Sequence, residues 1–228
     1  FYMNMATPLL KFTIWLFLSI GAGTTMAITG VYLYLAPTLP DAETLKDVDL
    51  QTPLRVYTAD GLLITEYGEK RRTPITYQEI PPQFIDALLA SEDDGFFEHS
   101  GIDLKGLARA VFDLVTTGRK KSGGSTITMQ VAKNYSLSSE KTFPRKFTEL
   151  LLALKIEKAL TKEEILELYV NKIYLGKRAY GIEAASQVYY GKSITELNLA
   201  ELAMIAGLPQ APSAANPIRS PERAVSRR

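Results

Sequence analysis

The sequence predicts a mainly α-helical domain that carries a small β-hairpin and follows one transmembrane helix. The first observation is a run without charge from Phe12 to Leu35. Two short segments of strand-forming residues flank the pair Asp60-Gly61, and this pattern is typical of a hairpin. From Pro81 onward, apolar residues recur at helical spacing, as expected of helices that bury one face.

The uncharged run is long enough to cross a hydrocarbon core of about 30 Å as a helix. A cleaved signal peptide is the alternative, but its apolar region would be shorter, and Thr25-Met26-Ala27 is a poor cleavage site. Lys11 precedes the run and four acidic residues follow it, which favours a cytoplasmic N-terminus. We therefore expect a cytoplasmic segment at 1–11, a membrane anchor at 12–35, a linker at 36–53 and an external domain.

The elements of this domain follow from local patterns. Strands are expected at Arg55–Thr58 and Leu62–Tyr67, within a hairpin element at 54–80. A helix behind Asp103 as N-cap would place one apolar face on Leu104, Leu107, Ala108, Val111, Leu114 and Val115. A long helix is expected at 143–160. Capping boxes start two more helices, at Thr161 with Glu164 and at Asn198 with Glu201, and Gly207 ends the second.

Composition excludes several kinds of chemistry. The 26 Lys and Arg residues nearly cancel the 25 Asp and Glu residues, so no global field indicates nucleic-acid binding. The chain contains no Cys, which excludes disulfides, thiolate catalysis and cysteine-ligated zinc. His99 is the only histidine, so a histidine metal site is excluded as well.

An acidic and aromatic segment, Ser91–Asp103, lies between two predicted helices. A solvated acidic loop is the plain interpretation. Glu92, however, follows the apolar face of Phe84, Leu88 and Leu89. Partial desolvation there would raise the pKa of the Glu92 carboxyl toward a value suited to acid/base catalysis.

A basic, glycine-rich segment, Arg119–Thr126, leads into a predicted helix at Ile127–Asn134. Free amides at a helix start, together with nearby cations, favour binding of a phosphate-like anion. A nucleotide P-loop is disfavoured because the Lys required before Ser125 is missing. A solvated loop is the alternative.

On the long helix, Arg145 and Glu149 are four residues apart and thus lie on one face, close to Lys146. Considered alone, such a pair is a surface ion pair of small energy.

Taken together, these segments resemble glycosyltransferase family 51, the peptidoglycan glycosyltransferases, and most closely the N-terminal part of class A penicillin-binding proteins of the 1A type. The resemblance runs in order along the chain, through Glu92–Asp103, Gly123–Gln130 with Lys133-Asn134, Arg145-Lys146 with Glu149, Glu164–Gly176, Gly181–Lys192 and Glu201–Pro212. One departure is Met129, where the family usually carries a glutamine. That substitution puts a polar contact in doubt, while Gln130 is retained.

The resemblance implies a lysozyme-like helical fold with a membrane-proximal hydrophobic subdomain, and a transferase domain at 81–228 that is truncated before a transpeptidase domain. It implies lipid II and the growing glycan chain as substrates, in the bacterial inner membrane with the domain in the periplasm, and other cell-wall synthesis proteins as partners. No cofactor is required. A divalent cation, Mg or Mn, is an optional ligand of Glu149.

The same resemblance implies roles for individual residues. Glu92 is the general base on the acceptor hydroxyl, and Glu149 is the second catalytic carboxylate, which orients the cations. The implied substrate-binding residues are Asp93, Phe96, His99, Gly124, Ser125, Thr126, Gln130, Lys133, Asn134, Arg145 and Lys146. A membrane-anchored lytic transglycosylase or glycan hydrolase is the alternative, and a non-catalytic membrane scaffold is a more distant one.

Overall fold

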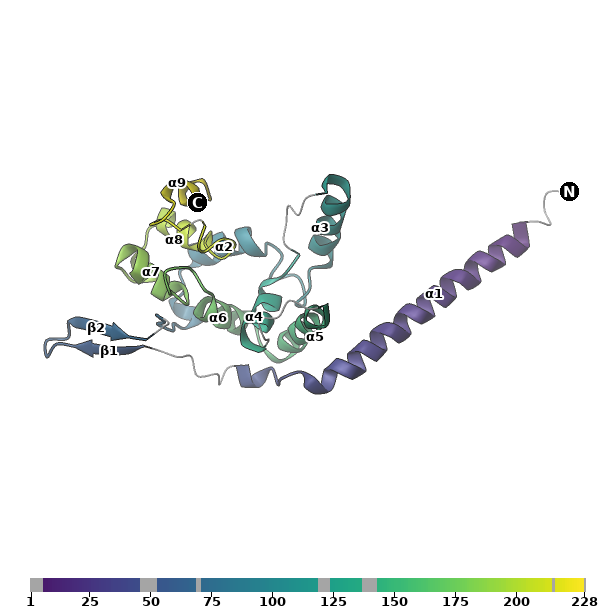
Figure 1. The fold of residues 1–228 in the computed structure, drawn as a ribbon, viewed down its shortest axis with the longest axis horizontal. Helices are drawn as coiled ribbons and strands as arrows, with labels where there is room; N and C mark the ends of the chain where they lie inside the picture. The colour runs from purple at the N-terminus through teal and green to yellow at the C-terminus, as the bar shows by residue number, and fades with distance from the viewer. Residues whose placement is uncertain are drawn as a thin grey trace. The chain divides into compact units, whose positions relative to one another are not determined.

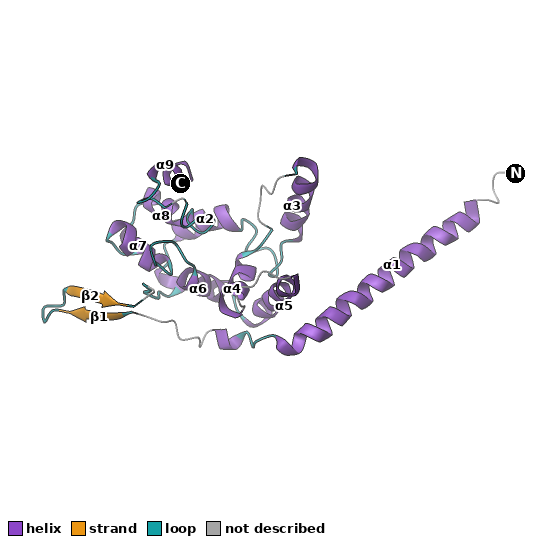
Figure 2. Ribbon diagram, viewed as in Figure 1, coloured by secondary structure: helices purple, strands orange, loops and turns teal. Residues whose placement is uncertain are grey.

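The computed structural model describes residues 6–45, 53–68, 71–118, 124–136, 143–214 and 216–227. It divides into two compact units, Phe1–Pro40 and Asp41–Arg228. Helices predominate in both, and a single hairpin supplies the strands of the described residues (Figures 1 and 2). The expected fold class, mainly α with a small hairpin and one leading apolar helix, is confirmed.

The first unit is built on α1, Ala6–Leu35. Within the described ranges, its segment Leu10–Leu35 is the one helix long and apolar enough to cross a membrane. Large apolar side chains such as Trp15, Phe17 and Tyr34 are exposed along it. The helix starts six residues before the predicted anchor at 12–35, and a short 3-10 turn at Ala36–Thr38, with Pro37 in its first turn, follows it.

The hairpin lies in the second unit. Strands β1 (Leu54–Tyr57) and β2 (Leu63–Tyr67) are antiparallel, with Leu54 opposite Tyr67 and Val56 opposite Thr65. The turn closes where the Thr58 amide donates to the Leu62 carbonyl at 2.8 Å. Gly61 has a φ of +85°, a conformation that glycine adopts without steric cost, which explains the Asp-Gly signal.

The rest of the second unit is a helical body. Its helices are α2 (Pro82–Glu92), α3 (Leu104–Thr117), α4 (Ile127–Ser136), α5 (Phe143–Ala159), α6 (Lys162–Lys172), α7 (Ile182–Tyr190), α8 (Leu199–Ala206) and α9 (Pro221–Arg227). Helix α4 packs against α5 and α6, and α2 packs against α8. Fully buried side chains such as Ile127, Ile156 and Ile165 form this core, each contributing about 1.5–3 kcal/mol by burial.

Both predicted capping boxes are present. The Thr161 hydroxyl accepts the Glu164 amide at 3.3 Å, and the Glu164 carboxylate accepts the Thr161 amide at 2.8 Å. Asn198 and Glu201 make the equivalent pair at the start of α8. The long helix ends at Ala159, one residue before the predicted end.

The segment that leads into α2 is fastened to α6 by side chains. Asn171 accepts the Ile75 amide at 2.9 Å and donates to the Ile75 carbonyl at 2.7 Å. Glu167 accepts the Tyr77 amide at 2.8 Å. These bonds connect residues more than 80 positions apart and so fix where α2 begins.

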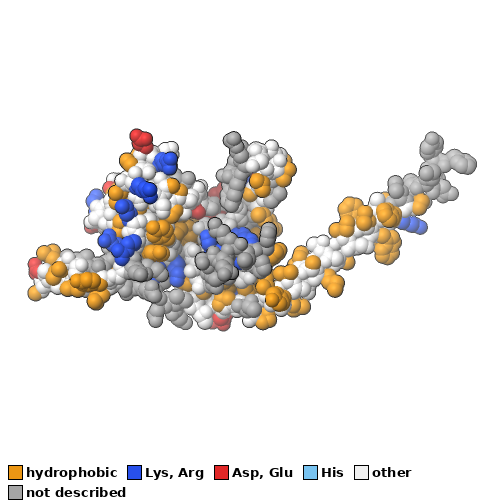
Figure 3. Space-filling view, viewed as in Figure 1, with side chains coloured by type: hydrophobic (Ala, Val, Ile, Leu, Met, Phe, Trp, Pro, Cys, Tyr) orange, Lys and Arg blue, Asp and Glu red, His pale blue; other side chains and the backbone are white. Residues whose placement is uncertain are grey.

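Helix α3 begins where it was predicted, with Asp103 in the N-cap position. The predicted N-cap position is confirmed, although the Asp103 side chain makes no capping hydrogen bond. The predicted apolar face is present but uncovered within the described part of the chain: Leu104 is 72% exposed and Val115 is 79% exposed. Hydrophobic side chains are visible along this helix in Figure 3.

Candidate active site

Glu92 is the last residue of α2, and its carboxylate faces a cavity of about 530 Å³. The cavity is also lined by Asp93 and Asp94 directly after α2, and by residues from α3, from the start of α4 and from the segment after α8, namely Arg109, Ser125, Gln130 and Gln210 among others. The Gln130 side-chain amide donates to Glu92 Oε2 at 3.1 Å. An amide N–H donor favours the ionised carboxylate, which is the form that acts as a base.

Tyr169, on α6, sets the orientation of Gln130. Its hydroxyl donates to Gln130 Oε1 over 3.4 Å, a long hydrogen bond. Burial raises the pKa of Tyr169 well above its usual value, and the charges of Glu92 and Asp93 raise it further. The phenol therefore stays protonated and remains a donor, which leaves the Gln130 Nε2 group directed at Glu92.

Asp93, which lines the cavity, forms a clamp with His99. The buried Asp93 carboxylate accepts the Ile127 amide at the start of α4 at 2.8 Å and lies 2.9 Å from His99 Nε2. The Gly101 amide donates to His99 Nδ1 at 3.1 Å, so the proton of a neutral His99 ring is on Nε2 and is donated to Asp93. Both side chains are thus committed to contacts within the protein.

Phe96 lies inside this clamp. Its side chain is 0% exposed, with the Phe97 ring edge-on at 5.2 Å and the Lys162 ammonium 4.4 Å above its ring. Because the Phe96 side chain has no accessible surface, it cannot contact a substrate directly. The geometry favours supporting roles for Phe96 and His99 rather than the direct substrate contact implied by the resemblance, whereas Asp93 lines both cavities beside Glu92.

Thr126 directly precedes α4 and connects this helix to the segment that holds His99 and Gly101. Its hydroxyl donates to the Gly101 carbonyl at 2.7 Å and accepts the Met129 amide at 3.1 Å. Gly101 has a φ of +89°, and a Cβ there would lie 3.0 Å from the Ala153 carbonyl oxygen, so only glycine fits. Of the glycine-rich segment, Gly124 and Ser125 also line the site, while residues 119–123 lie outside the described ranges.

A cationic group on α5 joins the site through Ser125. Lys146 Nζ donates to Ser125 Oγ at 3.0 Å and to Glu149 Oε2 at 2.9 Å. Arg145 Nε lies 3.2 Å from Glu149 Oε1 as an ion pair, although neither atom has hydrogen-bond geometry with a described residue. Glu149 is 3% exposed. One buried carboxylate therefore holds two cations beside the loop that lines the cavity, leaving a net positive charge.

Lys133 and Asn134 are exposed on α4. They lie three and four positions after Gln130, so they share its face of the helix. Neither lines the cavity that holds Glu92.

Arg109 was missed by the sequence reasoning. It lies on α3 and lines both the 530 Å³ cavity and a smaller one of about 60 Å³ that also contains Glu92. Asp113, four residues later, lines the larger cavity with it. The available signal was this i,i+4 charged pair on the side of α3 away from the apolar face. Gln210 carried no signal, because its place depends on tertiary packing.

Met129 replaces the usual glutamine without a local penalty. Its side chain is 2% exposed, so it belongs to the apolar core, while Gln130 reaches the site. Position 129 faces the protein interior, so the side chain at this position does not reach the cavity.

A divalent cation does not fit Glu149 as the structure places it. Both carboxylate oxygens already face cations, at 3.2 Å and 2.9 Å, and a metal ion there would be repelled by them. Among the described residues, no group of three His, Asp or Glu side chains is arranged to hold a metal ion. Among the described residues, Arg145 and Lys146 place positive charge beside the cavity.

The arrangement suits a particular class of reaction. A carboxylate held as a base can take a proton from a hydroxyl, and preorganised cations can stabilise an anionic leaving group. Together these groups are suited to the transfer of a group to a hydroxyl acceptor.

Comparison with known proteins agrees with this class. The transglycosylase family matches residues 60–228, and the chain belongs to that family. It is 60% identical over 220 residues to penicillin-binding protein 1A of Pseudomonas aeruginosa, covering 96% of this chain and 27% of that protein. It is 54% identical over 209 residues to the Escherichia coli protein of the same name, covering 92% and 24%.

A crystal structure of penicillin-binding protein 1A from Haemophilus influenzae matches with a TM-score of 0.42 and 36% identity, over 79% of this chain and 17% of that one. The chain spans about a quarter of the length of the curated relatives that it matches.

Proposed function

We propose that this chain is a peptidoglycan glycosyltransferase that polymerises lipid II into β-1,4-linked glycan in bacterial cell-wall synthesis. Membership of the transglycosylase family supports the reaction class. The observation that carries the proposal is that one site combines a carboxylate that can act as a base with cations that can bind a diphosphate. Glu92 faces the cavity, and Ser125, which lines the same cavity, is bonded to the Lys146–Glu149–Arg145 group.

The reaction follows from these positions. Glu92 accepts the proton of the acceptor sugar 4-hydroxyl, whose oxygen attacks the anomeric carbon of the donor chain. The bond from that carbon to the undecaprenyl diphosphate breaks on the opposite face, so the configuration inverts, and the bonding electrons leave with the phosphate oxygen. Lys146 and Arg145, together with Lys133, stabilise the diphosphate as it leaves.

Placement at the membrane completes the proposal. Helix α1 would anchor the chain in the inner membrane, with the N-terminus in the cytoplasm and the catalytic unit in the periplasm. The uncovered apolar face of α3 supports contact of that unit with lipid, which would let the substrate's tail remain in the bilayer. Association with other cell-wall synthesis proteins stays an expectation from the resemblance.

Incubation of the purified chain with lipid II in detergent, with products separated by length, tests the reaction. We expect glycan strands longer than the starting disaccharide and released diphosphate lipid. Shortening of preformed glycan with no polymer from lipid II would instead establish the hydrolase or lytic alternative.

A further inference from the structure

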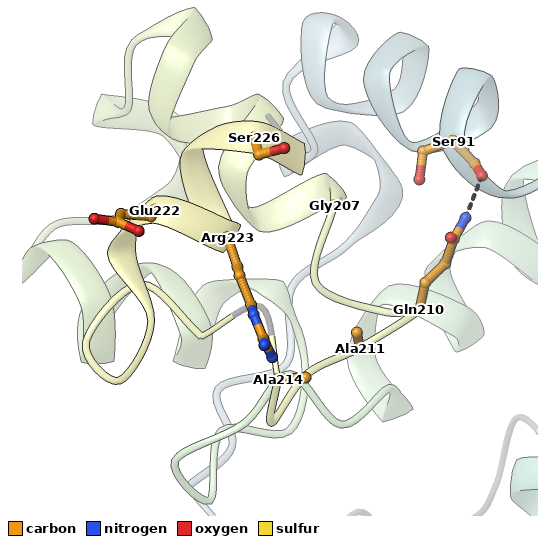
Figure 4. A pocket seen from close by; sticks show the side chains of 8 residues that line it. All are labelled: Ser91, Gly207, Gln210, Ala211, Ala214, Glu222, Arg223 and Ser226. Atoms are coloured by element: carbon orange, nitrogen blue, oxygen red, sulfur yellow. Dashed lines mark hydrogen bonds between the residues drawn. The ribbon is translucent and has the colours of Figure 1, made fainter.

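A second cavity adjoins the catalytic one. Its volume is about 680 Å³, within the range of about 300–1,000 Å³ typical of ligand pockets. Ser91 and Gln210 line both cavities, and the Gln210 side-chain amide donates to the Ser91 carbonyl at 2.8 Å (Figure 4). Since Ser91 directly precedes Glu92, a ligand bound at the catalytic carboxylate can extend into this second space.

A guanidinium enters the second cavity from α9. Arg223 is exposed and extends from the helix toward Ala214 (Figure 4). The neighbouring Glu222 also lines the cavity, but its carboxylate is directed away from the Arg223 guanidinium. Within the described ranges, the Arg223 side chain makes no hydrogen bond or ion pair. A planar guanidinium in a pocket is suited to a carboxylate, which it can bind through two parallel hydrogen bonds.

The substrate of the proposed reaction supplies such a group. Peptidoglycan precursors carry a peptide on the sugar, and that peptide has carboxylates. The cations assigned to the leaving diphosphate lie on α4 and α5, whereas Arg223 lies on α9. We propose that the second cavity binds the peptide of the glycan, with Arg223 pairing with one of its carboxylates. This inference rests on the proposed function and adds a specificity site to it.

Direct binding tests the inference without catalysis. The probes are a soluble peptidoglycan disaccharide with its peptide and the same disaccharide without it, titrated by calorimetry into the whole chain in detergent. We expect Arg223→Ala to weaken binding of the peptide-bearing probe about fivefold, the upper range for an exposed charge pair, and to leave the peptide-free probe unchanged. Arg223→Lys should fall between. Arg219→Ala, which removes the same charge from the loop before α9, should bind both probes as the wild type does.

Kinetic measurements distinguish two anions that Arg223 could bind, the carboxylate of the peptide and the diphosphate of the lipid. With peptide-bearing and peptide-free lipid-linked disaccharides, Arg223→Ala should raise KM for the first alone and leave kcat unchanged. An equal rise for both substrates would assign Arg223 to the diphosphate and overturn the proposal, as would equal binding of the two probes by the variant and the wild type. A wild-type chain that polymerises neither substrate would refute the transferase function, and the binding experiment would still decide whether the cavity holds the peptide.

Discussion

Glu92 is positioned by two successive hydrogen bonds that begin at a buried residue of the core. Tyr169, buried on α6, orients Gln130, and Gln130 donates to the Glu92 carboxylate. Each partner comes from a different helix, so the base is held by packing and not by its own loop. A group fixed in this way loses little freedom when substrate binds.

Glu149 is predicted to act through the cations that it holds. Glu149→Gln would leave Arg145 and Lys146 without their shared counter-charge. We expect polymerisation to fall at least about tenfold and the free energy of unfolding to fall by about 2 kcal/mol. Lipid II polymerisation and urea denaturation measure the two effects. Glu98→Gln, an exposed change in the acidic segment, should alter neither. Full activity in Glu149→Gln would show that these cations do not serve the reaction.

Alkaline pH should destabilise the domain through Tyr135. Burial raises the pKa of Tyr135 to about 12, with the Arg72 charge lowering and the Glu167 charge raising it. The unfolded chain loses this proton near pH 10, so Tyr135 contributes fully below pH 10, and its contribution is lost as the pH rises through about 12. We expect Tyr135→Phe to flatten the decline of urea midpoints over this window, with Tyr57→Phe in the exposed hairpin as control. Parallel curves for wild type and Tyr135→Phe would contradict the assignment.

At the scale of elements, features that depend on neighbouring residues in sequence were predictable, whereas features that depend on packing between helices were not. The capping boxes at Thr161 and Asn198 were predictable because each partner lies three residues away in sequence. The turn at Gly61 was predictable for the same reason. The burial of Phe96 was not, because Lys162 from α6 lies over its ring, and no sequence pattern places that residue there. Gln210 entered the site for an equally non-local reason, whereas Arg109 had a local signal in its i,i+4 pair with Asp113.

Helix α3 exposes an apolar face, with Leu104 and Val115 more than two thirds exposed. The proposed explanation is contact of this face with lipid. In lipid vesicles, replacing Phe112 and Val115 together by Ser should speed hydrogen exchange of residues 104–117, since water would reach the helix more often. Lys105→Ser, a polar position on the same helix, should leave exchange unchanged. Exchange at the wild-type rate in the double variant would show that this face does not contact lipid.

At the scale of the whole molecule, the sequence predicted the architecture better than the site. An uncharged run and helical periodicity are collective signals, and they correctly indicated a leading apolar helix and a helical domain. Assigning roles within Glu92–Asp103 required knowing which side chains point inward. Asp93 and His99 look as polar as Glu92 in sequence, yet they are bonded to each other, and Asp93 is further bonded to the start of α4. Glu92 and Asp93 both line the cavity, and of the two Asp93 is the more buried.

The central claim is that Glu92 is the base of a glycan polymerase. The most direct measurement is the rate of polymerisation of lipid II by Glu92→Gln beside the wild type and Glu98→Gln, with thermal unfolding recorded for all three. We predict a loss of at least about 100-fold for Glu92→Gln, with an unchanged unfolding midpoint and normal activity in Glu98→Gln. Polymerisation by Glu92→Gln at the wild-type rate would contradict the claim.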